Sequence, residues 1–288
     1  MAITYNDLYL DLRQKLRLEQ VEAYTLAARE IVCYAAGKTR QELQRDGRLY
    51  VPQDVERRVE ELTARHLAGE PVAYLIGEWS FYGLDLDINE SVLIPRIDTE
   101  VLAEKAIEFV SKCENARVLD LCAGSGCVGL AVAKHCPNSH VVLGEKSEAA
   151  LRICRQNTRR CGLTERVIPW QGDALERPSP QLGEFDCIVS NPPYIPDGDI
   201  AGLDVSVRDY EPMMALRGGE DGLDFYRAIC EKWRDALRVG GRLLFEVGIG
   251  QADDVLRIMR AAGFGDNTIT EDTGGVARVV AGTLCDEV

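Results

Sequence analysis

Histidine, closely paired cysteine and long apolar stretches are scarce or missing in this sequence. The chain has 3 histidines among 288 residues, and no two of its 10 cysteines have the two-residue spacing of zinc and redox sites. We therefore expect no metal site, and cysteines that act as small apolar side chains in a reducing compartment. No apolar run approaches the roughly 20 residues of a membrane helix, and residues 1–7 do not look like a signal peptide. These absences predict a cytoplasmic protein with no membrane partner.

The sequence also has fewer basic than acidic residues. Asp and Glu number 47 against 33 Lys and Arg, so the formal net charge is −14. Residues 1–75 carry 11 basic and 12 acidic side chains, which leaves −13 for the rest of the chain. Because an acidic surface repels the phosphate backbone, we expect no direct nucleic-acid substrate.

The first quarter of the chain has many features typical of helices, but no glycine-rich loop and no acid/base cluster. Apolar residues recur at helical spacing through residues 1–70. This small all-α domain is either a structural appendage or a docking module for a macromolecular substrate, and we prefer docking. Residues 71–97 are predicted to be a linker built on a β-hairpin that includes Tyr74 and Ile76 and turns at Gly83.

Residues 98–288 alternate strand and helix signals. Such alternation is typical of an α/β fold, a doubly wound parallel sheet whose ligands bind at the carboxyl ends of its central strands. The last two strands are expected to form a C-terminal hairpin. The expected strands are Val118–Leu121, Val141–Gly144, Val167–Trp170, Phe185–Ser190, Arg242–Val247, Asn267–Glu271 and Ala277–Ala281. The expected helices are 98–112, 126–134, Ser147–Arg160, Leu223–Arg238 and Gln251–Ala262.

A glycine-rich loop follows the first of these strands. Gly124, Gly126 and Gly129 fit the G-x-G-x-x-G pattern between a strand and a helix, and Glu145 ends the next strand, 19 residues after Gly126. A carboxylate at that position can accept hydrogen bonds from both ribose hydroxyls. The loop therefore predicts a cofactor that contains adenosine.

Asp120 discriminates between adenosine cofactors. It lies four residues before Gly124, where its carboxylate would repel the pyrophosphate of a dinucleotide but attract an ammonium and a sulfonium. S-adenosyl-L-methionine carries both of these cations. Asp173, after the third strand, is placed to bind the adenine amino group. We therefore predict this cofactor, with S-adenosyl-L-homocysteine as the product, in preference to a nicotinamide dinucleotide.

The segment Asn191-Pro192-Pro193-Tyr194 ends the fourth expected strand. The prolines have no N–H, so the segment offers the Asn191 side-chain oxygen, the Pro192 carbonyl and the flat face of Tyr194. A planar group with an NH₂, such as a carboxamide or a base amine, suits these acceptors, and a proline-rich turn is the alternative reading. With a sulfonium methyl nearby, the two acceptors would orient an amide nitrogen and stabilise the positive charge that it gains.

Five stretches together resemble the HemK/PrmC family, the peptide chain release factor N5-glutamine methyltransferases. Residues 120–129 with Glu145 are similar to motif I of S-adenosylmethionine-dependent methyltransferases, and 191–194 looks like the signature of amino-nitrogen methyltransferases. The other three stretches are 69–74, 93–100 and 210–224. The likeness covers essentially the whole chain and implies a Rossmann-like class I methyltransferase fold. It also implies methylation of the glutamine in the Gly-Gly-Gln motif of class I peptide chain release factors, with residues 1–70 helping to dock this partner.

The resemblance, together with the charge argument for Asp120, assigns site residues by position. Those expected to bind the cofactor are Asp120, Cys122, Ala123, Gly124, Ser125, Gly126, Glu145, Asp173, Ala174 and Asn191. Those expected to bind the substrate are Asn191, Pro192, Pro193 and Tyr194, of which Asn191, Pro192 and Tyr194 are the expected catalytic residues. The chain departs from the family at Cys122, where glycine is usual, at Ala174, where an aromatic is common, and at Ile97, where proline is frequent.

Other functions stay open at this point. The nearest alternative is a glutamine methyltransferase that acts on a ribosomal protein. An adenine-N6 nucleic-acid methyltransferase has a target NH₂ that fits the same acceptors, but the acidic catalytic half disfavours it. The presence of Asn191 and Pro192 disfavours an adaptor that binds S-adenosylmethionine without catalysis.

Overall fold

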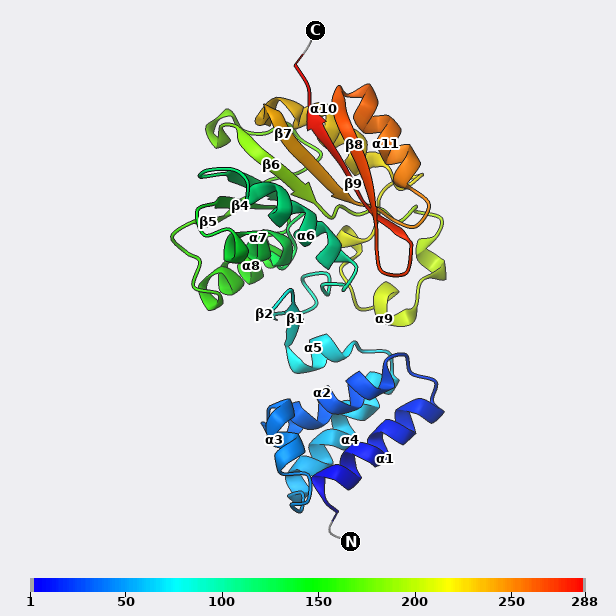
Figure 1. Ribbon diagram of the computed structural model, residues 1–288. Coiled ribbons are helices and arrows are strands. Elements are labelled where there is room, and N and C mark those ends of the chain that lie inside the picture. Colours follow the sequence, from blue (N-terminus) through cyan, green and yellow to red (C-terminus); the bar gives the residue numbers. More distant parts are fainter. Residues whose placement is uncertain (1–2, 287–288) are drawn as a thin grey trace. The chain divides into compact units, whose positions relative to one another are not determined.

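The structure, a computed structural model, describes residues 3–286 and divides into two compact units (Figure 1). The first unit contains the chain up to Glu78 together with Val205–Tyr210, and the second contains Trp79–Asp204 and the chain from Glu211 onward. The predicted domains 1–70, 71–97 and 98–288 stay predictions. Their outer ends, residues 1–2 and 287–288, lie outside the described residues.

The first unit is a helical bundle. Its elements are α1 (Tyr5–Leu18), α2 (Tyr24–Ala36), α3 (Arg40–Arg45), α4 (Gln53–Leu67), α5 (Val72–Ile76) and the short α9 (Val205–Arg208). Thr4 and Thr39 begin α1 and α3 as capping boxes, in which each hydroxyl accepts the backbone N–H three residues further on. The buried apolar face of α2 packs against α1, α4 and α5. In the same unit, the Tyr210 hydroxyl donates a hydrogen bond of 3.3 Å to the carbonyl of Ala68.

The predicted hairpin exists but is shorter than expected. Strands β1 (Glu78–Phe81) and β2 (Leu84–Asp87) form a two-stranded sheet, with Gly83 at a φ of 76° in the turn. The prediction was wrong for Tyr74 and Ile76, which lie in α5. Pro71 is the N-cap of this short helix and a left-handed Gly77 ends it, so the backbone preferences of these two residues outweigh the alternating pattern.

The second unit is built on a seven-stranded sheet in the order β5-β4-β3-β6-β7-β9-β8. Strands β3 to β7 are parallel, and β9 and β8 extend the sheet as an antiparallel hairpin. The mostly parallel α/β fold with a C-terminal hairpin is confirmed. The strands are β3 (Arg117–Leu121), β4 (His140–Glu145), β5 (Val167–Gln171), β6 (Phe185–Ser190), β7 (Leu237–Glu246), β8 (Phe264–Glu271) and β9 (Ala277–Leu284). The helices of this unit are α6 (Thr99–Val110), α7 (Cys127–His135), α8 (Glu148–Arg160), α10 (Asp224–Lys232) and α11 (Ala252–Ala261).

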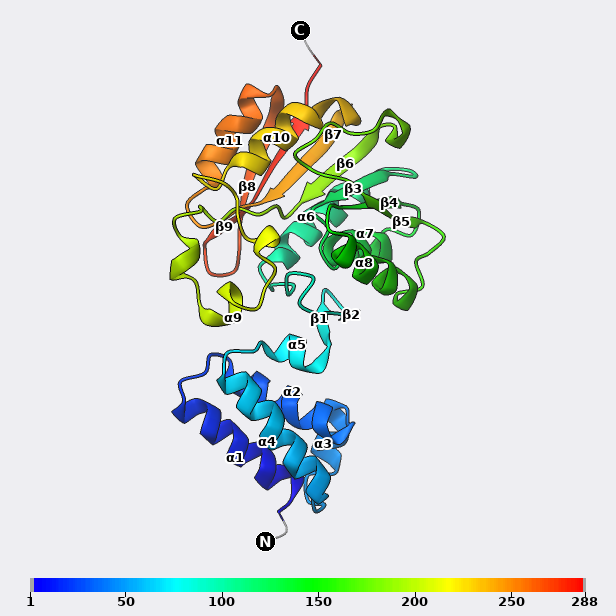
Figure 2. The ribbon, with the colours of Figure 1, turned by 180° about the vertical axis from the view of Figure 1, so that it is seen from behind.

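Helices cover both faces of this sheet (Figures 1 and 2). Successive residues of a strand point to opposite faces. In β3, Leu119 and Leu121 join a core cluster with Tyr226 of α10 and with residues of α11. Asp120 points the other way and contacts Gly129 of α7. Strands β3, β4 and β5 build one half of the sheet, and after β5 the chain crosses to β6, which lies on the other side of β3. The carboxyl ends of β3 and β6 therefore border the crevice where such folds bind ligands.

The predicted helix Leu223–Arg238 and the strand after it need a correction. Helix α10 ends at Lys232, a 3₁₀ turn follows, and β7 begins at Leu237 instead of Arg242. Leu237 pairs with Phe185 of β6, so pairing in the sheet outweighs the helical spacing of the apolar residues. The other predicted strands all occur.

Two of the features that are scarce in the sequence can be compared with the structure. All ten cysteines lie within the described residues and are free thiols. Within residues 3–286, no helix combines the length and the apolar character that crossing a membrane requires.

Candidate active site

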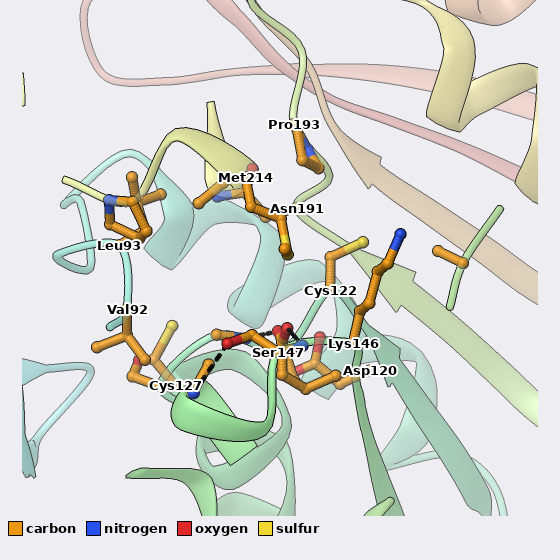
Figure 3. A pocket seen from close by; sticks show the side chains of 18 of the residues that line it. Val92, Leu93, Asp120, Cys122, Cys127, Lys146, Ser147, Asn191, Pro193 and Met214 are labelled. Atoms are coloured by element: carbon orange, nitrogen blue, oxygen red, sulfur yellow. Dashed lines mark hydrogen bonds between the residues drawn. The ribbon is translucent and has the colours of Figure 1, made fainter. Parts of the chain in front are cut away.

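A cavity of about 330 Å³ lies at the carboxyl ends of the central strands of the second unit (Figure 3). Most of the predicted site residues line it, although they come from four separate strand ends. The predicted residues that line the cavity are Asp120, Cys122, Ala123, Gly124, Ser125, Glu145, Asp173, Ala174, Asn191 and Pro193. Gly126, Pro192 and Tyr194 are not among the lining residues. The roles assigned to all of these residues are proposals.

Sequence reasoning missed several residues that also line the cavity. Figure 3 shows Val92, Leu93, Lys146, Ser147 and Met214 around it. Lys146 and Ser147 directly follow Glu145 at the end of β4, so the rule that ligands bind at carboxyl ends could have found them. No chemical signal in the sequence pointed to the others.

The glycine-rich loop leaves one side of its backbone open. Gly124 and Gly126 have φ values of 56° and 82°, a region that side chains disfavour, and the Gly126 N–H donates to the Ala123 carbonyl at 2.7 Å. A Cβ at Gly126 would lie 3.0 Å from the Leu143 side chain, whereas a Cβ at Gly124 would meet nothing within 4 Å. Gly126 thus packs the loop against β4, while Gly124 lets a ligand approach the main chain.

Glu145 joins the glycine loop to the start of α8. One carboxylate oxygen accepts the Gly124 N–H at 2.9 Å, and the other accepts the Ser147 N–H at 2.7 Å. A carboxylate offers about four acceptor positions, so each oxygen keeps capacity for a further donor. Two vicinal hydroxyl groups of a ribose fit this remaining capacity.

Asp120 is buried, although it also lines the cavity. Its carboxylate accepts the N–H of Gly129, in the first turn of α7, at 2.8 Å, so it occupies a donor that a phosphate would otherwise use. Burial raises the pKa of this carboxyl group to about 7, against the opposing effect of the Gly129 hydrogen bond. A bound cation would lower this pKa again, because an opposite charge favours the ionised form.

Replacing Asp120 by asparagine should change the pH dependence of stability. The folded protein holds a proton on Asp120 between about pH 4 and about pH 7, whereas the unfolded chain releases it, so the wild type loses stability as the pH rises through this range. Asparagine keeps an oxygen for Gly129 and has nothing to titrate. We expect Asp120→Asn to gain roughly 2–4 kcal/mol relative to wild type between these pH values.

Thermal unfolding measured at several pH values tests this expectation. The melting temperature of Asp120→Asn should rise relative to wild type as the pH increases, whereas that of the exposed control Asp235→Asn should follow wild type. Parallel curves for Asp120→Asn and wild type would contradict the predicted burial of the charge.

Asp173 and Lys146 both line the cavity and form an ion pair. The Asp173 carboxylate accepts the Leu175 N–H at 2.9 Å and pairs with the Lys146 ammonium at 2.8 Å. Burial opposes ionisation of Asp173, but these two partners outweigh it and lower its pKa. Next to them, buried Ala174 accepts the Trp233 indole N–H at 3.0 Å through its carbonyl. An aromatic residue therefore lies behind Ala174, although not at the position itself.

Asn191 follows β6 directly and faces the cavity. Its side-chain nitrogen donates to the Thr99 hydroxyl at 3.2 Å, which turns the NH₂ group toward Thr99. The segment after it is held by Gln251, whose side-chain nitrogen donates to the Tyr194 carbonyl at 2.9 Å. The Tyr194 side chain packs against the core cluster of the second unit.

Glu211 ties together two segments that line the cavity. Its buried carboxylate accepts the Ile94 N–H at 3.2 Å and pairs with Arg96. Burial raises the pKa of Glu211, and the charge of Arg96 opposes this shift. Pro212, which follows Glu211, and Pro95, which precedes Arg96, both line the cavity. The ion pair between Glu211 and Arg96 therefore holds these two lining segments in place.

Replacing Gly218 by alanine should displace the segment that carries Asn191. A Cβ at Gly218 would lie 2.8 Å from the Tyr194 Cα and 2.9 Å from the Pro193 carbonyl oxygen, and these backbone atoms can move only with the segment. We expect turnover by Gly218→Ala to fall at least tenfold, because a small misplacement of reacting groups is enough to slow a reaction by this much.

Gly202→Ala is the matched control for this change, since a Cβ there meets nothing within 4 Å. Turnover and melting temperature measured for both variants check the prediction. Equal turnover of the two variants would show that the segment tolerates the added methyl group.

Two family models match the chain. Residues 87–204 match the methyltransferase small domain, and residues 7–77 match the PrmC N-terminal domain. Among solved structures, the hMettl16 catalytic domain, determined in complex with the MAT2A 3'UTR hairpin 6, aligns with a TM-score of 0.59. It is 15% identical in sequence, and the alignment covers 79% of this chain and 84% of that one. A methyltransferase from Pyrococcus furiosus aligns with a TM-score of 0.50 at 16% identity, over 79% and 100% of the two chains. These structural likenesses show the fold alone.

Relatives in sequence are closer. A release factor glutamine methyltransferase of Geobacter sulfurreducens is 44% identical over 225 residues, which cover 77% of this chain and 76% of the relative. Release factor glutamine methyltransferases of Clostridium acetobutylicum and Gloeobacter violaceus are each 40% identical. They align over 73% and 81% of this chain, and over 74% and 82% of their own lengths.

Fold and cavity together define a class I methyltransferase that uses S-adenosylmethionine as methyl donor. The cavity fits this donor, because the open backbone at Gly124 and the Glu145 carboxylate suit an adenosine, and the buried Asp120 suits a cation. Within this class, the chain belongs to the HemK/PrmC family, the release factor glutamine methyltransferases.

Proposed function

We propose that this chain methylates the side-chain amide nitrogen of the glutamine in the Gly-Gly-Gln motif of a class I peptide chain release factor. The observation that supports this most is the position of Asn191, an amide-binding side chain, in the same cavity as Asp120 and Glu145. The name shared by the relatives supports the choice of substrate. The net charge of −13 beyond residue 75 supports a protein substrate over a nucleic acid.

Positioning and electrostatics account for the chemistry of this site. Bound S-adenosylmethionine supplies an electrophilic methyl group on a positively charged sulfur. The Asn191 side-chain oxygen and the Pro192 carbonyl accept the two hydrogens of the substrate amide, which leaves the nitrogen lone pair free to react. The same two oxygens stabilise the positive charge that the nitrogen gains. No strong base is needed first, because the methylated nitrogen is acidic and then loses its proton.

The remaining assignments also belong to this proposal. Pro193 lines the cavity beside Asn191 and limits the space for the substrate side chain. The packing of Tyr194 on the amide plane, which the sequence predicts, stays a prediction. Residues 1–70 dock the release factor, and the reaction takes place in the cytoplasm, where release factors act.

Mass spectrometry of a purified class I release factor, incubated with this enzyme and S-adenosylmethionine, tests the function. We expect the peptide that contains Gly-Gly-Gln to gain the mass of one methylene group, and a release factor whose motif glutamine is replaced to stay unmodified. A ribosomal protein fraction and duplex DNA serve as competing substrates. Methylation of either one without methylation of the release factor would overturn the proposal.

A further inference from the structure

Glu246 is a buried carboxylate next to the candidate active site that the proposed chemistry does not use. It ends β7, which pairs with β6 so that Ser190 lies opposite Phe245. Asn191 directly follows β6, and Glu246 is the next residue of β7. Glu246 is 2% exposed. Its Oε2 atom is buried and makes no hydrogen bond among the described residues. A buried carboxylate is costly, so its position behind Asn191 calls for an explanation.

Thr99 connects Glu246 with Asn191. Thr99 is the first residue of α6, which packs against β6 and β7, and it is 2% exposed. Its hydroxyl oxygen accepts the Asn191 side-chain N–H at 3.2 Å. The side chains of Thr99 and Asn191 both lie close enough to the Glu246 carboxylate to lower its pKa against the effect of burial. The three side chains therefore form one buried network behind the cavity.

The direction of these hydrogen bonds matters, because a terminal amide can present either its oxygen or its NH₂ to a ligand. A threonine hydroxyl both donates and accepts, so Thr99 alone would tolerate either orientation of Asn191. An ionised carboxylate only accepts. An ionised Glu246 therefore favours the arrangement in which the Thr99 hydroxyl turns its hydrogen toward the carboxylate, while its oxygen accepts from the Asn191 NH₂. The Asn191 oxygen then faces the cavity, where the proposed substrate amide needs an acceptor.

We infer that Glu246 is a positioning residue for methyl transfer, which acts through Thr99 to keep the Asn191 side-chain oxygen turned toward the substrate amide. The inference rests on the proposed function, since it needs an amide NH₂ as the group that Asn191 accepts.

The ionised form of Glu246 that this role requires predominates above about pH 7. Burial raises the pKa of Glu246 to about 7, while the nearby Thr99 hydroxyl and the charge of Arg278 on β9 lower it, and the charge of Asp98 raises it. Arg278 itself pairs with Asp98 at 2.6 Å and with Asp272 at 2.9 Å. Glu246 thus has a cation nearby without an ion pair of its own.

Glu246→Gln tests the inference with little change in volume. Glutamine can donate as well as accept, so it removes the fixed direction of the network and lets Asn191 turn its NH₂ to the cavity. We expect kcat on the release factor to fall about 10–100-fold, with the dissociation constant of S-adenosylmethionine unchanged within about twofold. Glu271→Gln, an exposed change in the same unit, is the control and should match wild type.

Two further measurements separate positioning from support of the fold. In an Asn191→Ala background, Glu246→Gln should lower kcat by less than about twofold more, since a residue that acts through Asn191 has nothing left to orient. Thr99→Ser, which keeps the hydroxyl, should retain most of the activity. Thr99→Val should lower kcat by about the same factor as Glu246→Gln. The comparison of Thr99→Ser with Thr99→Val tests the inference even if Glu246→Gln folds poorly. Melting temperatures are recorded for all variants.

The outcomes distinguish this inference from the proposed function. If the wild type leaves the release factor unmethylated, the proposed function fails. If the wild type is active and Glu246→Gln equals it, or the two changes multiply in the double variant, Glu246 does not position Asn191. Equal activities of Thr99→Ser and Thr99→Val would also overturn the inference.

Discussion

Asn191→Ala should lower kcat for methyl transfer by about 10²–10³-fold, the effect typical of losing one acceptor or donor that is aimed at transition-state charge. The reason lies in the chemistry of the proposed substrate. An amide nitrogen is a poor nucleophile because its lone pair is delocalised into the carbonyl. Orientation by two acceptors and stabilisation of the developing charge are what this site contributes, and alanine removes one of the two acceptors.

The binding of S-adenosylmethionine should change little in the same variant, because the glycine loop, Glu145 and Asp173 remain in place. Single-turnover rates on the release factor and calorimetric titration with the cofactor measure the two effects separately. Asn138→Ala is the control, since Asn138 is exposed, lies between α7 and β4 and does not line the cavity. Turnover of Asn191→Ala within about twofold of wild type would be incompatible with an amide-orienting role.

Glu145→Gln should weaken the binding of S-adenosylmethionine by about 10–100-fold, as expected for the loss of charge-assisted hydrogen bonds worth roughly 1.5–3 kcal/mol. The carboxylate accepts two backbone N–H groups, from Gly124 at 2.9 Å and from Ser147 at 2.7 Å. Glutamine has only one oxygen, so its NH₂ must face one of these donors. The change therefore disturbs the loop and also removes acceptors from the proposed ribose site.

Titration of wild type and Glu145→Gln with S-adenosylmethionine and with S-adenosylhomocysteine checks this effect. Both ligands contain the ribose, so both should lose affinity by a similar factor. Glu165→Gln, an exposed change in the same unit, should bind like wild type. An unaltered affinity of Glu145→Gln for both ligands would refute the assignment of Glu145 to the ribose.

Local signals predicted the parts of this protein that depend on short stretches of chain. The alternation of strands and helices indicated the parallel sheet, and Gly124 and Gly126 occupy the positive φ values that such a loop requires. Prediction was wrong in two places, once because a distant partner decided the conformation and once because local helix ends outweighed an alternating pattern. Leu237 continues a helical pattern but pairs with Phe185 in the sheet, and Tyr74 lies in a helix whose ends are set by Pro71 and Gly77.

Some residues of the candidate site could also be predicted from short stretches of sequence, whereas others reach the cavity only through the tertiary structure. The residues that follow β3, β4, β5 and β6 could be predicted because carboxyl ends of parallel strands meet at one edge of a sheet. Val92 and Met214 line the same cavity but come from segments with no chemical signal, and the ion pair between Arg96 and Glu211 brings those segments together. Glu246 was missed because its environment, and not its place in the sequence, makes it unusual.

The sequence alone determined the class of fold, the cofactor and the kind of group that the Asn191 segment can hold, because backbone preferences and the count of donors and acceptors belong to individual residues. Only the tertiary structure decided which way the Asn191 amide turns and how strongly Asp120 and Glu246 hold their protons. Both properties depend on burial and on neighbours that lie far away in the chain, such as Thr99 for Asn191 and Arg278 for Glu246.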